Sequence, residues 1–65
     1  MNHYYILSNQ RLALNHANRG KLLLLKKKYQ AAESEFDYAC YLDKDKTEYR
    51  QHLKETKLLI EKTVK

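Results

Sequence analysis

The chain has 65 residues, of which 43% are hydrophobic and 32% charged, with a single glycine, no proline and a single cysteine. So short a chain forms one domain at most, and Cys40 has no second cysteine with which to form an intramolecular disulfide. The longest uninterrupted apolar run, Leu22 to Leu25, is far too short to span a bilayer, and residues 1–10 lack the features of a secretory signal. We therefore expect a single domain over residues 1–65 in a soluble, cytoplasmic protein without a membrane span.

The net charge of +5 is distributed unevenly along the chain. Residues 1–28 hold six basic residues and no acid, and residues 29–45 hold five acids against one lysine. Residues 46–65 hold six basic residues and three acids. Neighbouring helices of opposite charge attract one another, although salt screens this attraction at exposed positions. The pattern therefore favours a helix order in which the acidic segment lies beside a basic one.

The first predicted helix begins near Ser8, whose hydroxyl can accept a hydrogen bond from a free backbone N–H. It includes Lys26 to Lys28 in its last turn, where cations suit the negative end of the helix dipole. Its apolar stripe is small in the middle and consists of Ile6, Ala13, Ala17, Gly20 and Leu24. Because glycine costs about 1 kcal/mol against alanine inside a helix, we expect a second helix to pack closely at Gly20.

The second predicted helix runs from about Gln30 to Leu42. Its apolar residues recur at steps of three and four, namely Tyr29, Ala32, Phe36, Ala39 and Leu42. The alanines keep this side of the helix thin, and Phe36 fills its middle. A short polar joint follows over residues 43–46.

The third predicted helix covers about residues 47–63. Asp45 and Glu48 have the spacing of a capping box, which indicates the helix start. One face carries Tyr49, Leu53, Ile60 and Val64, with Thr56 or Lys57 filling the gap. No stretch alternates apolar and polar residues for long enough to predict a strand. The fold class expected is therefore an all-α, three-helix antiparallel bundle.

These spacings resemble the tetratricopeptide repeat (TPR), a helix–turn–helix unit of about 34 residues. On that pattern the repeat runs over about residues 13–46, and Gly20 takes the place of the glycine at the helix crossing. Ala32 and Phe36 match the family's alanine and aromatic positions. The resemblance implies one TPR-like hairpin followed by a capping helix over about residues 47–63.

The sequence departs from the TPR pattern at four positions. His16 stands in place of the leading aromatic residue, and Arg19 stands in place of the leucine before the glycine. Leu23 stands in place of the following tyrosine, and Lys44 in place of the usual proline. The three-helix MIT domain is a rival of the same shape, although it usually has a longer joint between its last two helices. Both resemblances stay open at this point.

The sequence contains no Gly-rich phosphate loop, His-Glu-x-x-His or Cys-x-x-Cys motif. Cys40 has no motif that would supply the base a nucleophile needs. His16, Cys40 and His52 lie one on each predicted helix, whereas zinc sites usually contain closely spaced pairs of ligands. We therefore expect no enzyme activity, no cofactor and no metal site.

The resemblance also implies a partner-binding groove lined by the first helix. On this sequence the groove residues would be Leu14, Ala17, Lys21, Leu24 and Leu25. An apolar surface with one cation suits an amphipathic helix that carries an acidic residue. The function expected is protein–protein interaction, as a small adaptor or chaperone-like subunit that holds a helical or extended segment of a partner.

Two alternatives remain from the sequence. A basic helical protein could bind nucleic acid through Lys26, Lys27 and Lys28, although the acidic second helix would repel a phosphate backbone. A structural subunit could instead associate with itself through an apolar N-terminal tetrad, Tyr4, Tyr5, Ile6 and Leu7. In both the protein-binding and the self-associating case, we expect that the chain does not act as an isolated monomer.

Overall fold

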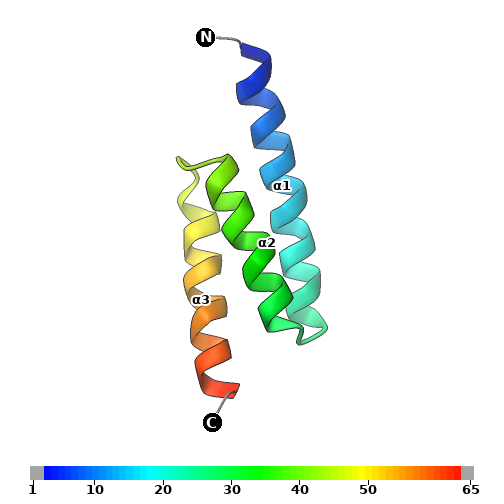
Figure 1. Cartoon of the computed structure of the whole chain (residues 1–65), viewed down its shortest axis with the longest axis vertical. Helices are drawn as coiled ribbons and strands as arrows, with labels where there is room; N and C mark the ends of the chain where they lie inside the picture. Colours follow the sequence, from blue (N-terminus) through cyan, green and yellow to red (C-terminus); the bar gives the residue numbers. More distant parts are fainter. Residues whose placement is uncertain (1–2, 64–65) are drawn as a thin grey trace.

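The computed structural model describes residues 3–63, and for residues 3–6 it describes the backbone alone. In this part of the chain there are three α-helices and no strand: α1 (His3–Leu25), α2 (Tyr29–Leu42) and α3 (Thr47–Thr63). Consecutive helices run antiparallel, and α2 lies between α1 and α3 (Figure 1). The predicted all-α, three-helix antiparallel bundle is confirmed.

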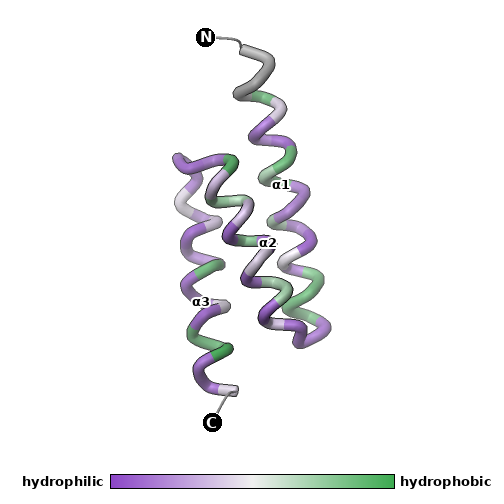
Figure 2. Tube along the Cα trace, in the orientation of Figure 1, coloured by the Kyte–Doolittle hydropathy of each residue, from purple (hydrophilic) through white to green (hydrophobic). Residues whose placement is uncertain are grey.

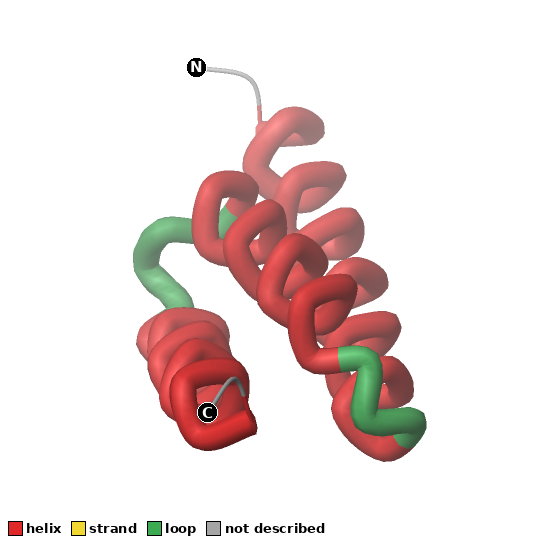
Figure 3. The backbone as a smooth tube through the Cα atoms, turned by 60° about the horizontal axis from the view of Figure 1, so that its bottom comes forward, coloured by secondary structure: helices red, strands yellow, loops and turns green. Residues whose placement is uncertain are grey.

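The three helices lie in a row, because α2 packs against both of its neighbours while α1 and α3 scarcely meet. The molecule is elongated along the helix axes, with extents of 47 × 18 × 13 Å (Figure 1), and Figure 3 shows the three helices side by side. α1 has 23 residues and α2 has 14, so the first turns of α1 extend past the end of α2 (Figure 1). No helix within residues 3–63 is both long and apolar enough to cross a membrane.

The core is built mainly from small side chains. Its buried hydrophobic residues are Ala13 and Ala17 of α1, Ala32, Phe36 and Ala39 of α2, and Tyr49 of α3. Thr56 is also completely buried, and its hydroxyl donates to the carbonyl oxygen of His52 at 2.7 Å. Figure 2 shows that hydrophobic residues also occur along α1 from its early turns to its last ones. Because the core is thin, many large apolar side chains stay outside it.

The ends of α1 differ from the prediction. The helix already contains His3, so Ser8 lies inside it and does not cap it. The helix stops at Leu25, and the three lysines that follow form the turn to α2. Lys27 has a φ of 63°, and the N–H groups of Lys27 and Lys28 donate to the carbonyls of Leu24 and Leu23, each at 2.9 Å. This Schellman-type closure ends the helix before the lysine run, so the expected last turn of lysines is wrong.

The start of α3 also differs in detail. The helix begins at Thr47, so Lys46, and not Asp45, immediately precedes it. Among the described residues, no hydrogen bond joins the Asp45 side chain to the backbone of α3, and Glu48 lies 3.7 Å from the Lys46 ammonium. The expected Asp45–Glu48 capping box is therefore wrong. Thr56 fills the buried face at mid-helix.

Candidate functional site

α1 presents a row of leucines to solvent on one side. Leu7, Leu14 and Leu25 are 46%, 49% and 81% exposed. Leu7 and Leu14 are two helical turns apart, and Leu25 lies three turns beyond Leu14, so all three share one side of the helix. This side is distinct from the alanine stripe that packs against α2.

A groove of about 340 Å³ lies between this side of α1 and the start of α3. Its lining consists of Leu7, Gln10, Arg11, Leu14, Asp43, Lys46 and Tyr49. Tyr49 is buried, its ring lies 5.8 Å from the Lys46 ammonium, and burial is the main cause that raises the pKa of its hydroxyl. The groove therefore combines three apolar side chains with a rim of two cations and one carboxylate.

The structure divides the five residues predicted to bind a partner. Leu14, Lys21 and Leu25 are exposed on one side of α1. Leu24 is half-buried and packs on the core. Ala17 is completely buried, because it belongs to the stripe that receives α2, so its predicted place in a groove is wrong.

The predicted N-terminal tetrad falls largely outside the described side chains. Of its four residues, the side chains of Tyr4, Tyr5 and Ile6 lie outside what the structure describes. Leu7 is exposed and lines the groove beside Leu14. Leu7 therefore belongs to the same surface as the predicted partner-binding leucines.

Sequence reasoning missed the contribution of α3 to this groove. Tyr49 was predicted only as part of the apolar face of the third helix, yet it lines the groove together with Leu14 of α1. Lys46 was predicted only as part of a polar joint, and it also lines the groove. No signal in the sequence could have paired residues so far apart, because the pairing depends on how α3 returns along α2.

The candidate zinc ligands take part in other contacts. The Nδ1 atom of His16 lies 2.6 Å from Oε1 of Glu35, which joins α1 to α2 by a hydrogen bond. His52 stacks on the ring of Phe36, with 5.2 Å between centroids. Over residues 3–63, no three side chains of the ligand types gather where they could hold a metal ion.

Cys40 is half-buried on α2. Burial, and then the negative charge of Asp37, raise the pKa of its thiol, while Arg50 and Lys57 act in the opposite direction. A thiol with a raised pKa is largely protonated near neutral pH and is a weak nucleophile. The surroundings of Cys40 thus do not activate it for catalysis.

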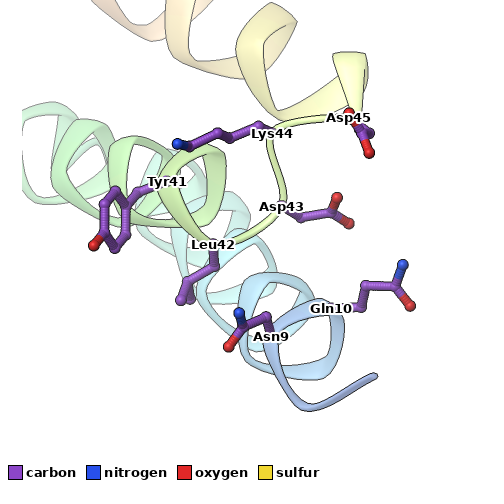
Figure 4. A pocket seen from close by; sticks show the side chains of 7 residues that line it. All are labelled: Asn9, Gln10, Tyr41, Leu42, Asp43, Lys44 and Asp45. Carbon is purple, nitrogen blue, oxygen red and sulfur yellow. The ribbon is translucent and has the colours of Figure 1, made fainter. Parts of the chain in front are cut away.

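The turn between α2 and α3 borders a second hollow of about 490 Å³. Its lining is largely polar and comprises Asn9, Gln10, Tyr41, Leu42, Asp43, Lys44 and Asp45. Figure 4 shows the side chains of Asp43, Asp45 and Gln10 on one side of the turn, and those of Tyr41 and Lys44 on the other. These groups do not converge on one point, so they do not form a catalytic arrangement.

The lysine run forms an exposed turn at the far end of α1. Lys26, Lys27 and Lys28 are all exposed, and they lie beside the first residues of the acidic α2. The lining of the groove includes none of the three. Any role in binding phosphate groups would therefore be separate from the groove.

No protein-family model, curated protein or solved structure matches this chain. The TPR and MIT resemblances stay predictions from the sequence. Function is therefore inferred from the side of α1 that carries exposed leucines and from the groove beside it.

Proposed function

We propose that this chain is a protein-interaction module, a small adaptor or chaperone-like subunit that holds a segment of a partner protein between α1 and α3. One observation carries the proposal: Leu7 and Leu14 flank the same groove as Tyr49, and each leucine is still about half exposed. Apolar side chains gathered in a concave surface are typical of sites that receive the apolar side of a partner helix.

The charges around the groove indicate the chemistry of the partner. Arg11 and Lys46 line the groove against a single acid, Asp43, and Lys21 follows further along α1. Acidic residues on the partner would meet these cations at the rim, where charge complementarity mainly sets specificity and the rate of association. The occupant that fits best is an amphipathic helix with apolar residues one and two turns apart and acids beside them.

The arrangement also agrees with a single TPR-like hairpin, with α3 as its capping helix, and this identity is part of the proposal. The two helices of the hairpin cross closely at Gly20, as the resemblance implies. A cytoplasmic location is proposed with it, since a single unpaired cysteine suits a reducing compartment. An adaptor of this kind needs neither a cofactor nor a catalytic residue.

Selection from a displayed library of helical peptides tests the proposal and requires no purified partner protein. We expect the enriched peptides to be amphipathic and acidic, and we expect Leu14→Ser and Arg11→Glu each to weaken their binding by about tenfold or more. Leu22→Ser is the matched control, because Leu22 is an exposed leucine of α1 that does not line the groove. Enrichment of basic peptides, or equal losses with Leu22→Ser and Leu14→Ser, would contradict the proposal.

Replacing Lys26, Lys27 and Lys28 with glutamine distinguishes nucleic-acid binding from peptide binding. We expect this variant to bind the selected peptides as the parent does, because these lysines lie outside the groove lining. Single-stranded and duplex oligonucleotides serve as the second probe. Binding of an oligonucleotide that weakens steeply with salt and disappears in the glutamine variant would support the alternative.

A further inference from the structure

We propose that a second copy of this chain packs on the outer side of the α1–α2 hairpin, away from the groove. We call this surface the tyrosine face and define it by Leu12, His16 and Arg19 of α1 and Glu35, Tyr38 and Tyr41 of α2. It lies on the other side of α1 from the groove, because Leu12 and Leu14 are about 200° apart around the helix. A peptide in the groove and a second copy on this face are therefore compatible.

Contacts between side chains show that the tyrosine face is one continuous surface. His16 of α1 bonds to Glu35 and meets the ring of Tyr38 edge-on, with 4.5 Å between centroids. Tyr38 in turn stacks with Tyr41 at 6.2 Å. Leu12 precedes His16 by one turn of α1, and Arg19 follows it by three residues, so both lie on the same side of the helix.

The leucine and the two tyrosines of this surface are exposed to a degree that suits a protein interface. Leu12, Tyr38 and Tyr41 are 45%, 47% and 69% exposed. Tyrosine is enriched at interfaces, since it supplies a large contact area with few rotatable bonds. Here the rings of Tyr38 and Tyr41 already stack on each other, which lowers the entropy lost when a partner covers them.

The total surface area leaves room for an interface of the usual size. The chain exposes 5277 Å², whereas a compact monomer of 7.8 kDa exposes about 4,400 Å². The surplus of about 900 Å² is close to the roughly 800 Å² per partner that a standard protein–protein interface buries. This surplus is spread along the elongated molecule, and a second copy related by two-fold symmetry could cover part of it on each copy.

The charges of the two helices explain why the occupant would be a second copy. On the tyrosine face, α1 contributes the cation Arg19 and α2 contributes the acid Glu35, whereas Arg11 and Lys21 lie on the groove side of α1. A two-fold axis parallel to the helices would lay α1 of each copy on α2 of the other, which would place Arg19 of one copy beside Glu35 of the other. The leucine side of α1 could not pair with its own copy in this way, because two such sides would place cations against cations.

Sedimentation equilibrium over about 5 to 200 µM protein tests the proposal, because dimerisation depends on concentration. We expect the parent chain to dimerise, and we expect Tyr41→Lys and Leu12→Glu each to raise the dissociation constant about tenfold or more, since each places a charge against a helix of like charge. Both residues lie outside the core, and circular dichroism will show whether each variant keeps its helix content. Leu14→Glu is the matched control, since Leu14 is equally exposed on the groove side and should leave the dissociation constant unchanged.

Two results would overturn the proposal. One is a parent chain that stays monomeric over the whole concentration range. The other is a dimer that Leu14→Glu disperses while helical Tyr41→Lys and Leu12→Glu variants do not, since that pattern would place the second copy in the groove.

Discussion

A Cβ atom on Gly20 would lie 2.8 Å from both Cε1 and Cζ of Phe36. Carbon atoms in contact are normally about 3.5–4.0 Å apart, so α1 and α2 could not approach as they do if position 20 carried a side chain. Phe36 is completely buried, and its ring is packed on all sides. The predicted close crossing at Gly20 is confirmed.

Gly20→Leu should therefore destabilise the fold. Overpacking a close contact of this kind costs about 1–3 kcal/mol, and we expect a loss in this range although leucine is the better helix former. Urea denaturation followed by circular dichroism measures the change. Asn18→Leu is the control, because Asn18 is exposed on the same helix and should not lower the stability.

The role of Phe36 in this contact can be tested by the same urea denaturation. We expect Gly20→Ala to be less harmful, or even stabilising, in a Phe36→Leu background, since the shortened side chain leaves room for the added methyl group. Strictly additive effects of the two substitutions would show that Gly20 and Phe36 do not share the contact described here.

Lys27→Gly should stabilise the protein. Lys27 occupies the left-handed region with a φ of 63° at the end of α1, a conformation that costs a residue with a Cβ about 1 kcal/mol and glycine almost nothing. We expect a higher midpoint of urea unfolding for this variant. Lys26→Gly, at the preceding turn position, should give no gain, and a similar gain there would argue against a conformational cause.

The hydrogen bond between His16 and Glu35 should contribute to the docking of α1 on α2. Both side chains are partly buried, and the two atoms are 2.6 Å apart. A double-mutant cycle with His16→Ala and Glu35→Ala should give a coupling free energy of about 1 kcal/mol at neutral pH. The exposed pair Gln51 and Glu55, at 3.3 Å within α3, is the reference and should give a coupling near zero.

Cys40 should react slowly with iodoacetamide near neutral pH. Because burial and Asp37 raise the pKa of the thiol, the rate should reach half its maximum at a higher pH than it does for a free cysteine peptide. Asp37→Asn should move this midpoint down, whereas Lys57→Gln should move it up. A midpoint at or below that of the peptide would contradict the assigned cause.

The raised pKa of the Cys40 thiol also predicts that the fold loses stability at alkaline pH, because the thiol then ionises more readily in the unfolded chain than in the folded one.

The sequence by itself determined the helices and the sides they bury. Apolar residues at steps of three and four predicted Ala32, Phe36 and Ala39 as the buried side of α2, and all three are completely buried. A glycine inside an otherwise regular helix predicted the close crossing at Gly20. These predictions succeeded because helical periodicity is a local property, and the period of 3.6 residues decides which side chains share a side.

Only the tertiary structure decided which sides meet and which remain exposed. The pairing of His16 with Glu35, and of Leu14 with Tyr49 in the groove, depends on the antiparallel docking of whole helices. The end of α1 depended on hydrogen bonds that close around Lys27, which outweighed the preference of lysines for a helix C-terminus. Periodicity orients side chains around one helix axis, but the position of each neighbouring helix is set by the turns and by the thickness of the packed core.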